Sequence, residues 1–283
     1  MKNRLMILDQ NKLREKAAPE VAEYLKNSPN VHFVLPEIAF IEMTKNENFR
    51  EDTLRGSLRM LSGYPSRTHV SKSLAQCFEE EFKTLTPASK HMTLREHRKS
   101  LRSLLGAING DDEGVEGLNR IISDTNGIHD SLSQYYLDHD ENKKRLGETI
   151  NEARETLGDG LVKDLRANRV SREQRLDLIY RKGNLNLARI LYRRSIPENK
   201  ALLFARKKPM LLRESYSVWW LALDWVSAGG FESAKPEKIT NDLIDQEYAI
   251  TATCFDGIIS AEKRVVCAYE DLKVLLNRPV FQY

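Results

Sequence analysis

The chain has little cysteine and no long apolar run. Its three cysteines are spread over 283 residues, without a CxxC pair or the cysteine–histidine spacing of a zinc site. This usage argues against a disulfide framework and favours a reducing compartment. No apolar stretch approaches the roughly 20 residues that a membrane-spanning helix needs. The first apolar residues meet Asp9 too early for a signal peptide. We therefore expect a cytoplasmic protein with no membrane partner.

An excess of charge of one sign is also missing from the chain as a whole. It has 44 basic and 41 acidic residues, a formal net charge of only +3, and no internal repeat or low-complexity tract. The hydrophobic fraction of 41% and the charged fraction of 30% are typical of a mostly helical protein with a real core. The length suits one large domain or two small ones.

The first 45 residues alternate between strand and helix patterns. Residues 5–8 form a continuous apolar run that ends at Asp9, and residues 31–35 form a second run. Such runs are typical of parallel strands that are buried on both faces. Residues 12–26 and 37–45 have the spacing of helices. The order strand, helix, strand, helix predicts the opening of a parallel α/β sheet.

Strand signals almost vanish in the middle of the chain, apart from a weak one at residues 68–70. The tryptophan-rich helix of this region is apolar around most of its circumference, so we expect its aromatic residues to lie in the core. The expected helices cover residues 51–62, 73–84, 93–108, 115–123, 131–157, 172–181, 185–194 and 209–228.

The stretch from residue 240 to 262 gathers acids around a helix and a short strand. Asp242 and Asp245 are three residues apart at what we expect to be the front of a helix, so they share one face. A turn at Asp256 leads into an apolar strand at residues 258–259, and Glu262 follows that strand. Asp256 precedes the strand and should therefore lie at the opposite edge of the sheet. Acids that converge repel one another, and a divalent cation relieves that repulsion.

Both ends of the chain therefore supply strands to one expected sheet. The carboxyl ends of parallel strands lie along one edge, where distant acids can meet. The fold class expected is a three-layer α/β domain with a parallel sheet, formed by residues 1–48 and 237–283. Residues 49–236 would form a large all-helical insertion that binds substrate or a partner.

These acids and their surroundings resemble the PIN-like nuclease family. Its members have a first strand ending in Asp-x-Asn and a second strand leading into a helix with an inward Glu. A later helix opens with Asp and carries alanines four and seven residues on, and a strand ending in Thr/Ser-x-Asp follows. The matching residues are Asp9, Asn11, Glu42, Asp245, Ala249, Ala252, Ser260 and Glu262. The resemblance covers residues 1–48 and 237–277, and it departs from the family at Glu262, where Asp is usual. The longer side chain would shift a metal ion or bind it through water.

The resemblance implies a metal-dependent ribonuclease that hydrolyses phosphodiester bonds with Mg²⁺ or Mn²⁺. Hard divalent ions prefer carboxylate oxygens, and such ions activate water and stabilise leaving oxygens. The implied direct ligands are Asp9 and Asp245, and the further ligands or water orienters are Glu42 and Glu262. Asn11 and Ser260 would form hydrogen bonds behind the ligands, and Asp242 would be auxiliary. Such proteins often act as toxins or defence effectors, which implies an inhibitory or effector protein as a partner.

Basic residues are concentrated between residues 163 and 208. This segment has 14 basic and four acidic residues, a net charge of +10, and Tyr180 and Tyr192 lie among them. The pattern predicts a surface that follows the phosphates of RNA, with tyrosines available for base stacking. The candidate contacts are Arg181, Lys182, Arg189, Arg193, Arg194, Lys207 and Lys208. The alternative is a solvated helix face that pairs with the acids of residues 138–155.

Other interpretations stay open for the acids as well. Asp9 after a strand can be an ordinary helix cap, as can Asp242, and Glu42 can be a surface acid. The departure at Glu262 favours a second function class, a non-catalytic nucleic-acid-binding or assembly module on the same fold. A phosphohydrolase of the haloacid-dehalogenase type also begins with Asp after a strand. That chemistry needs a second Asp where this chain has Asn11, and it needs a lysine motif that we do not find.

Overall fold

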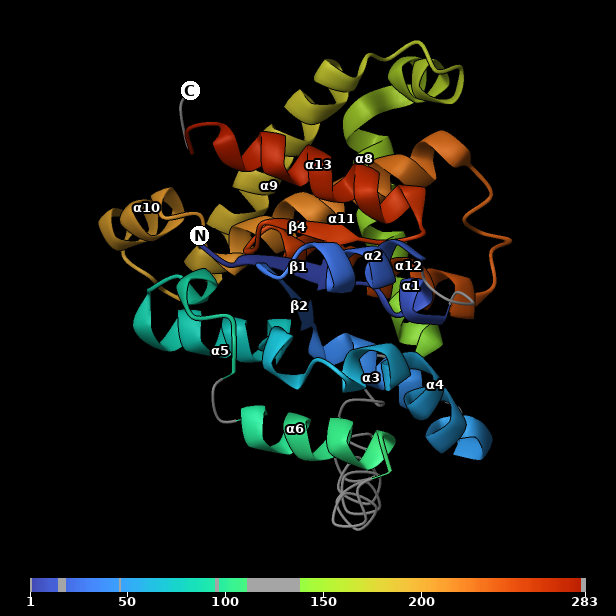
Figure 1. Cartoon of the computed structure of the whole chain (residues 1–283). Helices are drawn as coiled ribbons and strands as arrows, with labels where there is room; N and C mark the ends of the chain where they lie inside the picture. Colours follow the sequence, from blue (N-terminus) through green and yellow to red (C-terminus); the bar gives the residue numbers. More distant parts are fainter. Residues whose placement is uncertain (1, 15–18, 46, 95–96, 111–137, 281–283) are drawn as a thin grey trace. The chain divides into compact units, whose positions relative to one another are not determined.

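The chain is a mixed α/β protein with a four-stranded parallel sheet and many helices (Figure 1). The computed structural model describes residues 2–14, 19–45, 47–94, 97–110 and 138–280. Within these residues no helix combines the length and the apolar character needed to cross a membrane. The segment 115–123, expected to be helical, lies outside the described residues.

All four strands of the sheet occur where the sequence predicts them. They are β1 (Arg4–Leu8), β2 (Val31–Leu35), β3 (Thr68–Val70) and β4 (Gly257–Ile259), in the order β3-β2-β1-β4. Every neighbouring pair is parallel. Both ends of the chain thus meet in one sheet, and β1 lies between β2 and β4 (Figure 1).

The strands form because their apolar runs are buried without interruption. Ile7 and Leu8 of β1 are fully buried, as are Phe33, Val34 and Leu35 of β2. Burial on consecutive positions means that both faces of the sheet are covered, which the absence of alternation in the sequence indicates. Each fully buried side chain of this size stabilises the fold by about 1.5–3 kcal/mol.

Two compact units divide the chain. The first comprises Met1–Leu74, Lys90–Leu137 and Thr251–Val266, and it contains the whole sheet. The second comprises Ala75–Ser89, Asp138–Ile250 and Cys267–Tyr283. The strand β3 comes from the segment 49–236, which we expected to be a helical insertion, and the division into domains given above stays a prediction.

Helices α1 (Gln10–Arg14), α3 (Glu37–Thr44) and α6 (His97–Ile108) of the first unit each pack against α4 (Arg50–Ser62) (Figure 1). The helix expected at residues 12–26 is described as α1 and a separate helix, α2 (Pro19–Asn27). Proline suits the first turn of a helix, because its missing N–H has no partner there anyway. Short 3₁₀ turns lie at Glu47–Phe49, Pro65–Arg67 and Ala88–Lys90.

Arg67 joins the end of α2 to the start of β2. Its guanidinium donates hydrogen bonds to the carbonyl oxygens of Tyr24, Leu25, Ser28 and Val31, at 2.7–3.0 Å. The last carbonyls of a helix have no partner within the helix, so these bonds satisfy groups that would otherwise be orphaned. The start of β2, and with it the register beside β1, is thereby fixed.

Helix α11 (Met210–Ala228) is the centre of the second unit. It packs against α8 (His139–Arg166) and α9 (Arg172–Arg193), and it is buried around most of its circumference. Trp219, Trp220 and Trp225 are each 4% exposed, so the expectation that they belong to the core is confirmed. The unit also contains α5 (Leu74–Thr84) from Ala75 on, α10 (Glu198–Arg206), most of α12 (Pro236–Ala252) and most of α13 (Lys263–Asn277).

The helices observed between residues 138 and 206 differ from the expected ones. Residues 172–181 and 185–194 form the single helix α9, which continues through Gly183. A Cβ atom at Gly183 would lie 2.3 Å from the ring of Tyr216, so glycine serves the close helix crossing there and does not break the helix. The helix α10 was not expected at all. The helix α8 begins at its cap Asp138 and extends to Arg166, with a kink at Gly158.

Candidate functional site at the carboxyl edge of the sheet

Asp9 lies directly after β1, at the carboxyl edge of the sheet. Its backbone N–H donates to the carbonyl oxygen of Ile259 at 3.0 Å, so the pairing of β1 with β4 continues through Asp9. The residue is 1% exposed. The backbone of Asp9 is thus fixed by the pairing of β1 with β4, independently of the contacts that its side chain makes.

The two carboxylate oxygens of Asp9 have different partners. Oδ1 accepts a hydrogen bond from the backbone N–H of Asn11 at 3.0 Å, in the geometry of a helix cap for α1. The cap interpretation of Asp9 is therefore correct for this oxygen. Asn11 reaches Asp9 through its backbone, whereas we had expected its amide side chain. Oδ2 accepts from the hydroxyl of Ser260 at 2.5 Å, across 251 residues of chain.

Ser260 is itself oriented by Glu262. The backbone N–H of Glu262 donates to Ser260 Oγ at 3.0 Å, which leaves the hydroxyl proton free to point at Asp9. A hydroxyl that accepts one bond and donates another has little freedom to turn. The Ser-x-Glu spacing at the end of β4 thus builds a short relay from Glu262 through Ser260 to Asp9.

Burial dominates the electrostatics of this relay. It raises the pKa of Asp9 above its ordinary value, because the charged form loses its contact with water. The hydrogen bonds from Ser260 and Asn11 act in the opposite direction, and the nearby Glu262 carboxylate raises the pKa further. The Glu262 carboxylate therefore adds to the effect of burial on the pKa of Asp9, as the smallest of these four influences. Glu262 is exposed.

Asp256 confirms the expected polarity of β4. It precedes the strand, and its Oδ2 accepts from the backbone N–H of Leu5 at 2.7 Å. Its own N–H donates to the carbonyl oxygen of Leu5 at 2.8 Å. The two bonds close the amino edge of the β1–β4 pair, opposite to Asp9. Asp256 and Asp9 thus mark the two ends of the same strand pair.

Glu42 belongs to the same unit as Asp9. It lies half-buried on α3, the helix that follows β2, and the parallel strands β1 and β2 end at the same edge. Among the residues that the structure describes, no group of three or more His, Cys, Asp or Glu side chains is placed to hold a metal ion. What the first unit brings together is the carboxylate of Asp9 and the hydroxyl of Ser260, with the backbone N–H of Glu262 behind that hydroxyl. These groups offer the hard oxygen donors that Mg²⁺ and Mn²⁺ prefer, so they fit part of a ligand set.

Asp242 and Asp245 lie on α12, in its part that belongs to the second unit. The helix begins at Pro236, so both acids are in its interior, and the expectation that they open the helix is wrong. The helix extends one turn earlier than expected because Pro236 serves as its first residue and does not break it. Asp242 is 7% exposed, and Asp245 is half-buried. A cap role for Asp242 is excluded by its position within the helix.

Part of the basic segment makes contacts inside the second unit. Arg189 forms an ion pair with Glu152 at 2.6 Å. The ammonium of Lys182 donates to Thr156 Oγ1 and lies over the ring of Trp219. Arg194 lies over the ring of Phe82, 4.6 Å from its centroid. All three side chains have partners within the unit, and the pair of Arg189 with Glu152 is of the kind that the alternative of a helix face pairing with the acids of residues 138–155 predicts.

The other predicted contacts of this segment face solvent. Arg181, Arg193 and Lys207 are exposed, and Lys208 is half-buried at the end of α10. Among the described residues none forms an ion pair with Arg181, Arg193 or Lys207. The exposed part of the segment therefore keeps an uncompensated positive charge.

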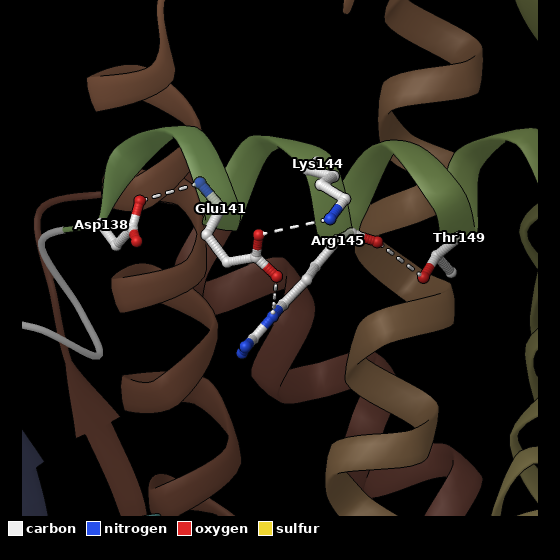
Figure 2. A network of polar contacts seen from close by, with 5 residues as sticks. All are labelled: Asp138, Glu141, Lys144, Arg145 and Thr149. Atoms are coloured by element: carbon white, nitrogen blue, oxygen red, sulfur yellow. Dashed lines mark hydrogen bonds and ion pairs between the residues drawn. The ribbon is translucent and has the colours of Figure 1, made fainter.

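The acids at the start of α8 are mostly paired within their own helix (Figure 2). Asp138 caps the helix by accepting from the N–H of Glu141, and Glu141 pairs with Lys144 at 3.6 Å and Arg145 at 2.9 Å. The hydroxyl of Thr149 donates to the carbonyl of Arg145 at 3.4 Å, one turn further on. Glu141 is thus engaged with local bases and Asp138 with a backbone N–H, whereas Glu152 reaches the basic segment.

A histidine pair in the sheet was not predicted. His32 of β2 and His69 of β3 are joined through Nδ1 and Nε2 at 2.9 Å, with nearly coplanar rings. Burial lowers the pKa of His69 to about 4, helped by His32 and Arg98, and burial also lowers the pKa of His32. The pair depends on the register of two strands, so no local sequence pattern could have indicated it.

Two acids of the second unit, Glu214 and Glu81, have raised pKa values. Burial raises the pKa of Glu214 on α11 to about 7, and within the described residues it forms no hydrogen bond or ion pair. Burial also raises the pKa of Glu81 on α5, which accepts from the backbone N–H groups of Ala88, Met210 and Leu211. Glu81 thereby caps the start of α11, a structural role.

No family model, curated protein or solved structure matches the chain. The interpretation of the site therefore depends on its own geometry and on the motif in the sequence.

Proposed function

We propose that the protein is a metal-dependent ribonuclease of the PIN-like type. The observation that carries the proposal is the relay at the carboxyl edge of the sheet, where Ser260 holds Asp9 and Glu262 follows two residues later. The parallel order β3-β2-β1-β4 supports it, since it puts the ends of β1 and β4 side by side. We also propose that the sheet and its helices form the three-layer arrangement of that family.

The carboxylates of Asp9 and Glu262 are the proposed ligands in the first unit. Two like charges held close together repel, and a divalent cation between them relieves that cost. A bound Mg²⁺ or Mn²⁺ would activate a water molecule and stabilise the leaving oxygen. Ser260 would keep Asp9 in one orientation, as groups behind metal ligands commonly do. Glu42, Asp242 and Asp245 enter the proposal through the sequence motif.

RNA is the proposed substrate, and the exposed cations of the segment 163–208 support it. They supply positive charge without internal partners, which suits a polyanion. A toxin or defence role, with an inhibitory or effector protein as partner, follows from the family resemblance.

The test is cleavage by the purified chain of mixed RNA, tRNA and single-stranded DNA with Mn²⁺ or Mg²⁺. We expect metal-dependent cleavage of RNA, and we expect Glu262→Gln to reduce it by at least about tenfold. Glu262 is exposed, so this variant should fold normally. Asp256→Asn is the matched control, because Asp256 lies on the same strand pair at the other edge and should be dispensable. If the parent chain, Glu262→Gln and Asp256→Asn cleaved RNA equally well, the proposed role of Glu262 would be wrong.

A second candidate is a non-catalytic nucleic-acid-binding module. The observation in its favour is that Asp9 is 1% exposed and uses both oxygens in hydrogen bonds, as a purely structural clamp would. RNA binding with a steep salt dependence, and no cleavage with any divalent metal, would decide for this candidate.

A further inference from the structure

The exposed face of α9 carries an aromatic ring among cations. Arg181 and Tyr192 are 11 residues apart, which is about three helical turns, so they lie on one face. Tyr192 is 84% exposed, and Arg193 beside it is exposed too. Tyr180 differs, because its hydroxyl donates to the carbonyl of Pro279 and Arg278 lies over its ring. Of the two tyrosines in the basic segment, only Tyr192 is free to receive a ligand.

The end of α9 holds Tyr192 on a defined support. Ser195 has a φ of 55°, which ends the helix abruptly. The N–H of Ile196 donates to the carbonyl of Leu191 at 3.1 Å, and the N–H of Ser195 donates to that of Tyr192 at 2.8 Å. These bonds satisfy the last carbonyls of the helix. The backbone under Tyr192 is therefore fixed, and ordering of the ring on binding costs little entropy.

Helix α10 repeats the pattern of α9. Leu203 is 58% exposed, and Arg206 and Lys207 are exposed three and four residues later, on the same face. The two helices pack against each other and are joined by a short turn (Figure 1). We call the set Arg181, Tyr192, Arg193, Leu203, Arg206 and Lys207 the α9–α10 surface.

The charge of this surface is not compensated. Among the described residues none pairs with Arg181, Arg193, Arg206 or Lys207. A single exposed tyrosine would need no explanation. An exposed ring at the end of one helix, with four unpaired cations on the same two packed helices, supplies the groups that a stacking platform beside a phosphate track needs.

We propose that the α9–α10 surface binds single-stranded RNA, with a base stacked on Tyr192 and phosphates along the four cations. In a duplex the bases are paired and stacked on one another, so none is available to stack on Tyr192. A membrane surface calls for a continuous apolar face, whereas the exposed large apolar residues of these helices are separated: Leu185 and Tyr192 lie about two turns apart on α9, and Leu203 lies on α10. The choice of RNA over DNA rests on the proposed ribonuclease function.

The experiment is a titration of labelled oligouridine followed by fluorescence anisotropy, with EDTA present so that no metal-dependent cleavage occurs. We expect Tyr192→Ala to weaken binding about tenfold, since a stacked base contributes about 1–3 kcal/mol. Tyr192→Phe keeps the ring and should bind like the parent. Arg193→Gln and Lys207→Gln should each reduce the slope of log K against log salt by about 1. Phe49→Ala is the matched control, because Phe49 is an exposed aromatic residue (58%) of the other unit.

Parent-like binding by Tyr192→Ala overturns the proposal, as does equal weakening by Phe49→Ala. Equal affinity for oligothymidine argues against RNA as the ligand, and binding to anionic vesicles in place of oligouridine argues against nucleic acid. Because EDTA is present, a failure of the nuclease proposal leaves this result unchanged. A protein that binds RNA through Tyr192 and never cleaves it would keep this inference and discard the nuclease.

Discussion

Asp9 in the first unit and Glu81 in the second are both buried carboxylates, but their surroundings differ. Burial raises the pKa of each, and hydrogen bonds to each act in the opposite direction. Glu81 accepts from three backbone N–H groups, and the nearby Arg213 favours its charged form. Asp9 accepts from one backbone N–H and one hydroxyl, and the carboxylate of Glu262 raises its pKa further.

The two sites differ in how far they compensate the buried charge. The carboxylate of Glu81 lies at the start of α11, where the helix dipole and the free N–H groups favour a negative charge. These N–H groups and Arg213 offset part of the cost of burying its charge. Asp9 accepts from one backbone N–H, and the charged group that acts on its pKa is the carboxylate of Glu262.

The largest expected effect is on stability, and it concerns Glu81. Glu81→Ala leaves the N–H groups of Ala88, Met210 and Leu211 buried without an acceptor, so we expect a loss of about 3 kcal/mol in the free energy of unfolding. Asp9→Asn keeps one oxygen as an acceptor and should cost less than about 1.5 kcal/mol. Urea unfolding followed by circular dichroism measures both.

For catalytic activity we expect the opposite order: the substitution at Asp9 should have the larger effect and the substitution at Glu81 the smaller one. Asp9→Asn should reduce metal-dependent cleavage by at least about 100-fold, since it removes a proposed ligand. Glu81→Gln keeps an acceptor at the cap and should cleave like the parent under conditions in which it is folded. If Asp9→Asn cleaved normally and lost as much stability as Glu81→Ala, both acids would be structural.

A smaller effect is the dependence of the free energy of unfolding on pH, which has opposite signs for Glu81 and His69. The pKa of Glu81 is raised, so its contribution to stability is present at low pH and is lost as the pH rises. The pKa of His69 is lowered to about 4, so its contribution is present at neutral pH and is lost as the pH falls below about 6.5. Between pH 7 and pH 5 we expect a loss of about 1–2 kcal/mol from His69.

His69→Gln should flatten this dependence on pH. His91→Gln is the matched control, because His91 is exposed and belongs to the same unit. Urea unfolding at pH 7 and pH 5 gives the comparison. An unchanged loss in His69→Gln would show that the acid sensitivity arises elsewhere.

Much of the sheet could be predicted from the sequence, because its strands are short continuous apolar runs. Residues 5–8 and 31–35 needed no tertiary information. The closeness of Ser260 to Asp9 followed from topology, since parallel strands end at one edge. The Ser-x-Glu relay followed from the motif at the end of the last strand.

The rest depended on contacts that no local pattern contains. The helices expected at residues 172–181 and 185–194 form one helix, in which Gly183 permits a close approach to Tyr216. Pro236 looked like a stop and instead begins α12. The histidine pair depends on how β2 and β3 align, and the cap by Glu81 joins residues 129 positions apart. The exposure of Tyr192 and the engagement of Tyr180 likewise follow only from packing.

The most direct measurement of the central claim is Mn²⁺ binding by isothermal titration calorimetry, without RNA. We expect the parent chain and Asp256→Asn to bind Mn²⁺ with the same affinity, and Glu262→Gln to bind at least about tenfold more weakly. This result would assign the cation to the carboxyl edge of the sheet. Equal Mn²⁺ affinity in all three proteins, or no binding by the parent, would contradict the account.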